Sequence, residues 1–283
     1  MAMKSSKIMR YIALLLAVLC IVGAFVACSG SSDGDSEKKS SDSQATKTDS
    51  GASKETPKDG FVTIDDVRFY YVNGEPQVDT IVGDESEGYF YADKSGAINS
   101  GYCNGMTIGD EDWIIIEGKA YKVETESDKC LFTAAKDIAA CTTVDMTKEE
   151  KAQAAFDYIK EHYLEGVRHN PPYSYTKKDW PIVCANDLFV YGKGDCYSYG
   201  AAYAYMAKAI GYEEVYACNS GGHGWAEIDN RTYDPEWSLH SNNYTYFGIG
   251  YDEECDVPYA NSIADEADFK RLKIEVHSDF TAS

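Results

Sequence analysis

Hydrophobic and polar residues are arranged in four different ways along the chain, and each arrangement predicts a different structure. An unbroken apolar run extends from Tyr11 to Val26, and the residues from Cys28 to Asp59 then include almost no large apolar side chain. Short runs of aromatic and β-branched residues follow, separated by turn-forming residues. The last segment adds apolar residues at helical spacing. The pattern therefore predicts a leader, a polar linker, a small β domain and an α+β domain, at residues 1–27, 28–59, 60–142 and 143–283.

The third segment is predicted to consist of hairpins. The run Val67–Val72 precedes Asn73-Gly74, a dipeptide that suits the positive φ angles of a tight hairpin turn. Trp113–Ile116 and Lys119–Val123 flank Glu117-Gly118 in the same way. No helical pattern is evident here, so we expect an all-β domain.

Two helices are predicted in the last segment. Thr147 and Glu150 have the spacing of a capping box, and apolar residues recur at helical intervals after them. Asp195 is a suitable N-cap for a second helix, which would end at Gly211. Cys196 then lies in the first turn, where unpaired backbone N–H groups favour a thiolate. Because Asp195 opposes that effect, the thiol needs a cationic partner.

A predicted hairpin supplies such a partner. His223–Ile228 is expected as one strand and Arg231–Asp234 as its return, because Asp229-Asn230 suits a two-residue turn with positive φ angles. In this register Ile228 pairs with Arg231, and His223 pairs with Glu236. Asp234 is then a diagonal neighbour of His223 on the same face, roughly 7–8 Å away at Cα. A thiol, an imidazole and a carboxylate in this order form a nucleophile, a base and a group that orients the base.

Three motifs carry a resemblance to a known family. Lys193–Cys196 at a helix start, Gly222–Trp225 and Tyr233–Trp237 follow one another as in the transglutaminase-like superfamily. The resemblance spans roughly residues 147–240 and implies a papain-like core, in which a helix carrying the cysteine packs on an antiparallel sheet. It implies that Cys196, His223 and Asp234 are catalytic. No calcium-binding segment like those of animal transglutaminases is recognisable, and we expect neither a metal nor a cofactor.

The resemblance also implies a mechanism. His223 takes the proton of Cys196, Asp234 fixes the imidazole, and the thiolate attacks an amide carbonyl to form a thioester. Water then gives hydrolysis and an amine gives a crosslink. We favour a peptidase or amidase over a crosslinking enzyme, because hydrolysis needs only water. The backbone N–H of Cys196 is one candidate oxyanion donor, and Asn186 is another.

A non-catalytic alternative remains open. The same scaffold could keep its triad and serve as a binding or adhesion module at the cell surface. Alkylation of Cys196 measured against pH separates the two hypotheses, because only the enzyme needs a thiol that reacts as a thiolate near neutral pH.

The N-terminal segment resembles the leader of bacterial lipoproteins. Three basic residues precede the apolar run, which ends in Phe25–Cys28 with the small residue Ala27 before the cysteine. The run is slightly short for a membrane span, so we expect cleavage and lipid attachment at Cys28. The linker that follows is too polar to bury a core and is expected to be a flexible tether. The chain is therefore predicted to be exported and anchored on the extracellular face of the cell membrane.

Composition narrows the partners and the cysteine chemistry. The 283 residues carry a formal charge of −21, which argues against a nucleic-acid partner. Of nine cysteines, Cys20 lies in the leader and Cys28 is the lipid site. If Cys196 is the unpaired thiol, the other six could form disulfides in several combinations, or they could be small buried side chains. No CxxC spacing occurs among them, so a zinc site is not expected.

The aromatic hairpins allow one further hypothesis about partners. The segments Tyr70–Glu75 and Gly88–Gly101 resemble in part the aromatic repeats of cell-wall and choline-binding proteins, although the spacing is irregular and Gly101-Tyr102 replaces the usual Gly-Trp. A small β core is the interpretation we favour for these aromatic residues. A protein or peptide substrate is expected, and cell-wall peptide is one possibility.

Overall fold

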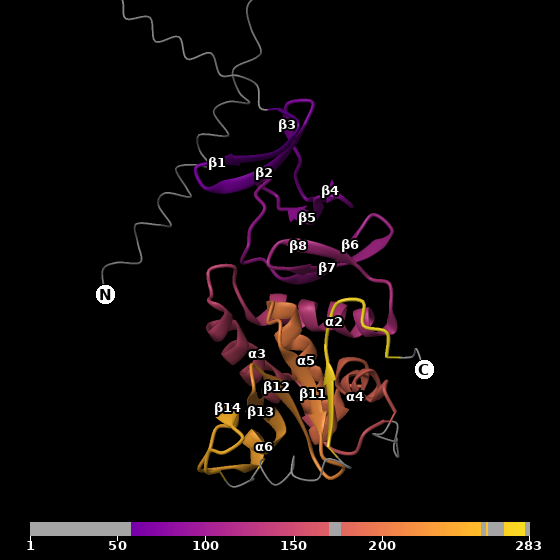
Figure 1. Cartoon of the computed structure of the whole chain (residues 1–283), viewed down its shortest axis with the longest axis vertical. Helices are drawn as coiled ribbons and strands as arrows, with labels where there is room; N and C mark the ends of the chain where they lie inside the picture. Colours follow the sequence, from indigo (N-terminus) through magenta and orange to yellow (C-terminus); the bar gives the residue numbers. More distant parts are fainter. Residues whose placement is uncertain (1–57, 170–176, 256–258, 260–268, 281–283) are drawn as a thin grey trace, which may run out of the picture. The chain divides into compact units, whose positions relative to one another are not determined.

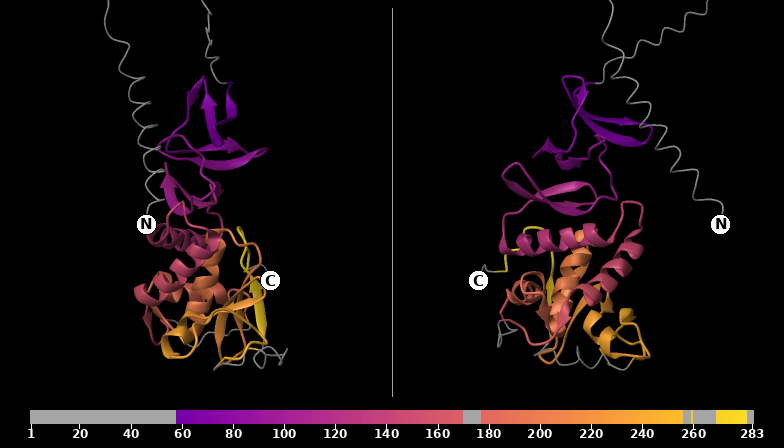
Figure 2. Two further views of the ribbon diagram at one scale, coloured as in Figure 1. Left: turned by 90° about the vertical axis from the view of Figure 1, so that its left-hand side faces the viewer. Right: turned by 180° about the vertical axis from the view of Figure 1, so that it is seen from behind.

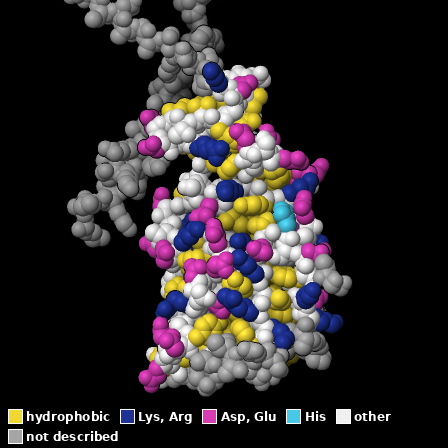
Figure 3. All heavy atoms as spheres, viewed as in Figure 1, with side chains coloured by type: hydrophobic (Ala, Val, Ile, Leu, Met, Phe, Trp, Pro, Cys, Tyr) yellow, Lys and Arg dark blue, Asp and Glu magenta, His cyan; other side chains and the backbone are white. Residues whose placement is uncertain are grey.

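The computed structural model describes residues 58–169, 177–255, 259 and 269–280, all of which belong to one compact unit (Figure 1). The predicted leader, the lipid site Cys28 and most of the tether lie outside these residues. Within them, no helix is both long enough and apolar enough to cross a membrane. Acidic and basic side chains are interspersed over the face seen in Figure 3, as expected if the negative charge serves solubility.

The β region consists of two antiparallel sheets. The first contains β1 (Gly60–Ile64), β2 (Val67–Val72) and β3 (Glu75–Pro76). The second has the strand order β4-β5-β8-β7-β6. Its strands are β4 (Thr80–Asp84), β5 (Gly88–Ala92), β6 (Asn104–Ile108), β7 (Glu111–Ile116) and β8 (Lys119–Lys122). The hairpins predicted at Asn73-Gly74 and Glu117-Gly118 are confirmed, and all four turn residues have positive φ angles.

The prediction that residues 60–142 are all-β is wrong, because they end in a long helix. Helix α2 (Glu126–Cys141) begins with a capping box between Thr125 and Asp128. Among its buried residues only Leu131 and Ile138 are large and apolar, which gives little apolar contrast in the sequence. The helix lies directly on β6, since a Cβ atom at Gly105 would be 2.2 Å from the backbone oxygen of Phe132. It also lies against α5 (Figure 2). The β region and the C-terminal region therefore share a hydrophobic core.

The C-terminal region combines helices with a five-stranded antiparallel sheet, so the α+β class is confirmed. The sheet order is β14-β13-β12-β11-β15. Its strands are β11 (Val215–Asn219), β12 (Gly224–Ile228), β13 (Arg231–Tyr233), β14 (Phe247–Gly250) and β15 (Lys270–Lys273). The helices are α3 (Lys148–His162), α4 (Trp180–Phe189), α5 (Cys196–Ile210) and α6 (Pro235–His240). A short parallel pair, β9 (Leu164–Glu165) and β10 (Lys193–Gly194), leads into α5.

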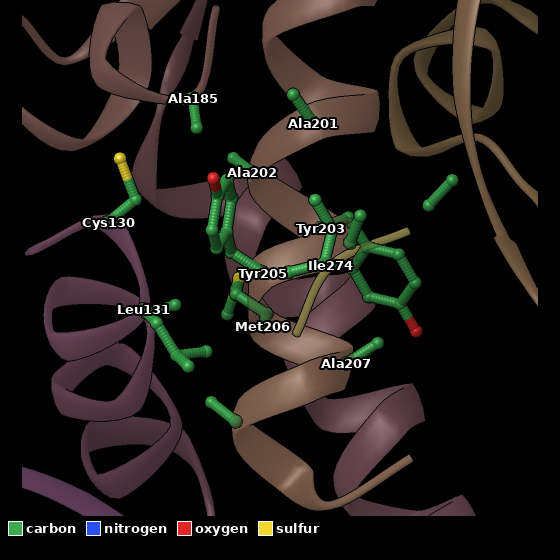
Figure 4. Packing of buried hydrophobic residues seen from close by; sticks show 14 of the residues in the cluster. Cys130, Leu131, Ala185, Ala201, Ala202, Tyr203, Tyr205, Met206, Ala207 and Ile274 are labelled. Atoms are coloured by element: carbon green, nitrogen blue, oxygen red, sulfur yellow. The ribbon is translucent and has the colours of Figure 1, made fainter. Parts of the chain in front are cut away.

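Helix α5 is the centre of the core. Every residue of it except Cys196 and Lys208 is buried. Figure 4 shows Tyr205 and Met206 directed toward Cys130 and Leu131 of α2. Three buried tyrosines of α5, Tyr199, Tyr203 and Tyr205, use their hydroxyl groups in hydrogen bonds, and that of Tyr205 pairs with Ser127 at 2.9 Å.

The absence of a side chain at Gly200 lets α5 approach the sheet. A Cβ atom there would lie 2.6 Å from Cα of Trp225, on β12. The backbone of β12 therefore rests directly on the helix. This close contact fixes the position of β12 relative to the first turn of α5.

The predicted hairpin is partly confirmed. Asp229 and Asn230 have φ angles of 50° and 62°, and Ile228 pairs with Arg231 as expected. The expected pairing of His223 with Glu236 is wrong, because the ladder ends at Tyr233 and the chain enters α6. The change of direction has a local cause. Asp234 caps α6 and Pro235 occupies its first turn, where the missing N–H is not needed.

Candidate active site

Cys196 is the first residue of α5 and is partly exposed. The Oδ1 atom of Asp195 accepts hydrogen bonds from the backbone N–H groups of Tyr197 and Ser198, at 3.2 and 3.4 Å. These bonds fix the first turn of the helix. The N–H of Cys196 itself is at a position where an α-helix supplies no partner. It is therefore free, as far as the helix is concerned, to bind a developing negative charge.

His223 connects the thiol with a carboxylate. His223 directly precedes β12, and Asp234 directly follows β13. The Nε2 atom of His223 lies 2.5 Å from Oδ2 of Asp234. The side chain of Cys196 makes a hydrogen bond with the same imidazole. Because Nε2 is committed to Asp234, the thiol must use Nδ1. The structure thus brings together the three residues that the sequence singled out, in the order thiol, imidazole, carboxylate.

Asp234 is buried but is surrounded by hydrogen-bond donors. Only 1 % of the residue is exposed. The hydroxyl of Tyr259 donates to Oδ2 at 2.5 Å, and the backbone N–H of Trp237 donates to Oδ1 at 3.0 Å. Burial raises the pKa of Tyr259, so its phenol stays protonated and remains a donor. These donors stabilise the carboxylate in place of water.

Two opposing influences act on the pKa of His223. Burial of the ring opposes its positive charge and is the largest single influence. The charge and hydrogen bond of Asp234, with a further contribution from Cys196, outweigh it and raise the pKa of His223 to about 10. The site therefore favours an imidazolium beside the sulfur, as a thiolate–imidazolium pair requires.

Aromatic rings surround the imidazole. The indole N–H of Trp237 donates to Nδ1 of His223 at 3.2 Å, and the two rings meet edge to face with centroids 5.6 Å apart. The ring of Trp225 stacks with the imidazole at a centroid distance of 6.2 Å, and its own N–H donates to the hydroxyl of Tyr251. Only 15 % of the His223 side chain is exposed in this aromatic setting.

Arg168 is a candidate functional residue that the sequence did not reveal. Its Nε atom lies 2.9 Å from Oδ2 of Asp195, and only 7 % of its side chain is exposed. The guanidinium also lies 5.5 Å from the ring of Tyr197. It offsets the negative charge of Asp195, which would otherwise oppose a thiolate at the next residue. Arg168 and Asp195 are far apart in the sequence, so only the folded structure brings them together.

Asn186 has a hydrogen-bond partner outside the triad. It lies in α4, and its side-chain oxygen accepts a hydrogen bond from the thiol of Cys130 at 3.4 Å. This contact directs the amide oxygen toward α2. The backbone N–H of Cys196 thus remains the better candidate for an oxyanion donor.

A second cluster of ionisable groups lies beside the triad. His240 contacts Glu165 at 3.1 Å and Glu236 at 3.5 Å. Burial raises the pKa of Glu236, and the nearby charge of Asp234 adds to the effect. Because the histidine already pairs with both carboxylates, we assign no metal ligand to this cluster.

The other cysteines do not form the disulfides that the sequence allowed. In the described part of the chain, Cys103, Cys130, Cys141, Cys184 and Cys218 are free thiols, and all of them except Cys141 are buried. Burial raises the pKa of Cys130 and of Cys184 to about 12, which makes both unreactive near neutral pH. Among the two interpretations of these residues, that of small buried side chains holds for this structure.

Comparisons with known proteins add no relative. No family model matches the chain, and searches of curated proteins and of solved structures found no match. Functional inference for this chain therefore depends on the geometry of the site.

Proposed function

We propose that this chain is a thiol enzyme of the transglutaminase-like type that acts on amide bonds through a thioester on Cys196. The observation that carries the proposal is a pair of hydrogen bonds of His223, one from the thiol of Cys196 and one to the carboxylate of Asp234. A helix with the cysteine at its start, packed on an antiparallel sheet with the other two residues, also supports a papain-like core.

In the proposed reaction, the Cys196 proton moves to Nδ1 of His223 and the thiolate attacks an amide carbonyl. The backbone N–H of Cys196 stabilises the oxyanion. Collapse of this intermediate breaks the C–N bond, and His223 returns the proton to the leaving amine. Water, deprotonated by His223, then attacks the thioester and releases the acid and the thiol. An amine in place of water would give a new amide instead.

Location and substrate belong to the same proposal. The lipobox-like leader supports anchoring through Cys28 on the extracellular face of the membrane. The polar tether would let the enzyme reach proteins or wall peptides near the surface. We favour hydrolysis over transfer, because water is abundant at so exposed a location.

The proposal is tested with three substrates in parallel: casein, a glutamine peptide with a labelled amine, and purified peptidoglycan. The matched control is Cys196→Ala, which removes only the sulfur. Turnover that requires Cys196 supports the enzyme, and the substrate that responds distinguishes hydrolysis from transfer. Equal signals from the wild type and Cys196→Ala would contradict the proposal and leave the binding module as the explanation.

A further inference from the structure

Trp237 makes a contact that bears directly on proton transfer. Its indole N–H donates to Nδ1 of His223 at 3.2 Å. An indole nitrogen is a donor only, so Nδ1 must supply its lone pair to this bond. The other ring nitrogen is committed to Asp234. The indole therefore competes for the lone pair that would accept the proton of Cys196.

The hydrogen bonds of the imidazole with Asp234 and Trp237 come from a single helical turn. Asp234 caps α6, and its Oδ1 atom accepts the backbone N–H of Trp237 at 3.0 Å. This bond fixes the indole relative to the carboxylate. The turn from Asp234 to Trp237 thus supplies both bonds: the carboxylate of Asp234 accepts from Nε2, and the indole of Trp237 donates to Nδ1.

We propose that Trp237 is a positioning residue that limits the basicity of His223 by occupying the lone pair of Nδ1. The proposal deepens the proposed function and rests on His223 as the base of that reaction. Protonation of Nδ1 would direct two N–H groups at each other, so the indole disfavours the imidazolium that Asp234 favours.

Most of the groups that face His223 favour its protonated form, so a group that opposes protonation has a use at this site. The carboxylate of Asp234 is bonded to the ring, and that of Glu236 lies close to both residues and pairs with His240. Both carboxylates favour the charged ring, and so does the thiol of Cys196 once it ionises. Tyr259 remains a neutral donor to Asp234. An imidazolium that holds its proton too tightly would protonate a leaving amine poorly, because acid–base catalysis works best near the operating pH.

The test is a pH titration of the His223 ring by ¹⁵N NMR in the full folded chain, with the signal assigned by its loss in His223→Gln. Trp237→Phe removes the N–H. Replacement of Trp237 with benzothienylalanine also removes it but preserves the shape of the indole, which covers the case in which the phenylalanine variant folds poorly. Loss of one neutral hydrogen bond should raise the proton affinity of His223 roughly fivefold. The titration should move to higher pH in both variants.

Benzothienylalanine at Trp225 is the matched control, because that indole also contacts the His223 ring but donates its N–H to Tyr251, and the replacement preserves its size. The titration of this control should match the wild type. An unchanged midpoint, or a midpoint at lower pH, in the variant with benzothienylalanine at Trp237 would overturn the proposal. This measurement needs no substrate, so it can fail while Cys196-dependent turnover is found, and it can succeed while no substrate in the panel is turned over.

Discussion

At the scale of single residues, the site depends on the surroundings of Asp234. Among the described residues, three donors bond to its two oxygens: the imidazole of His223, the hydroxyl of Tyr259 and the backbone N–H of Trp237. A carboxylate can accept from all three, because it has two oxygens and no hydrogen of its own. The bond between Nε2 and Asp234 sets the tautomer of His223, so Nδ1 is the nitrogen that can accept a proton.

Asp234→Asn is therefore expected to impair catalysis strongly while preserving the fold. The asparagine NH₂ group would face a donor in either orientation, so His223 would lose its preferred tautomer or its orientation. We expect kcat/KM to fall by roughly 10²- to 10⁴-fold on whichever amide substrate responds. Asp229→Asn, at an exposed turn position with positive φ, is the control and should leave kcat/KM unchanged. Comparable activity of Asp234→Asn and the wild type would remove the carboxylate from the mechanism.

At the scale of secondary-structure elements, the contact between α5 and β12 positions the nucleophile relative to the base. The two elements meet where Gly200 has no side chain, four residues after Cys196 and beside Trp225. Since Trp225 is two residues from His223, any shift of the strand away from the helix also moves the imidazole from the sulfur.

Gly200→Ala tests this contact. The added methyl group would approach the backbone of Trp225 to 2.6 Å, and backbone cannot move aside as a flexible side chain can. We expect a loss of about 1–3 kcal/mol in the free energy of unfolding, measured by urea denaturation, with reduced activity. Gly222→Ala is the control, because a Cβ atom there meets nothing within 4 Å. Equal stability of both variants would show that the helix and strand are not packed as described.

Local signals made some elements predictable from the sequence, and long-range packing hid others. Asp195 and Gly211 marked the ends of α5, and Asp229-Asn230 set the register of β12 and β13, because caps and turns depend on neighbouring residues. Helix α2 was missed because only Leu131 and Ile138 among its buried residues are large and apolar. The break after Tyr233 was missed because the strand pattern outweighed the cap and proline that begin α6.

The residues of the candidate site also fall into those that the sequence predicted and those that it did not. Motif context pointed to Cys196, His223 and Asp234, which the structure places in contact. Arg168 could not be predicted, because its role arises from a tertiary ion pair with Asp195. Tyr259 is a comparable case, since nothing in the nearby sequence relates it to the carboxylate that it contacts.

At the scale of the whole molecule, the proton affinity of His223 couples the site to folding. The folded chain raises the pKa of His223 to about 10, from an ordinary value near 6.5. The folded state therefore binds this proton more tightly than the unfolded state does. The resulting stabilisation is fully present below about pH 6.5 and is lost as the pH rises toward 10.

This coupling predicts a pH-dependent difference between the wild type and His223→Gln. The free energy of unfolding of the wild type, relative to the variant, should decline between about pH 6.5 and pH 10, by at most about 1.4 kcal/mol per pH unit. Urea denaturation of both proteins across this range measures the difference and cancels the contribution of other groups. A difference that is constant, or that grows with pH, would show that His223 does not hold an extra proton in the folded state.

The most direct test of the central claim is to label the folded protein with limiting iodoacetamide at about pH 6 and to map the modified cysteines by mass spectrometry. Ordinary thiols are almost fully protonated at that pH. Cys141 is a useful comparison, since it is also partly exposed and burial raises its pKa to about 11. We predict that Cys196 is modified far faster than Cys141, and that His223→Ala abolishes this preference. Similar labelling of both cysteines, or a preference for Cys196 that persists without His223, would contradict a thiol activated by the imidazole.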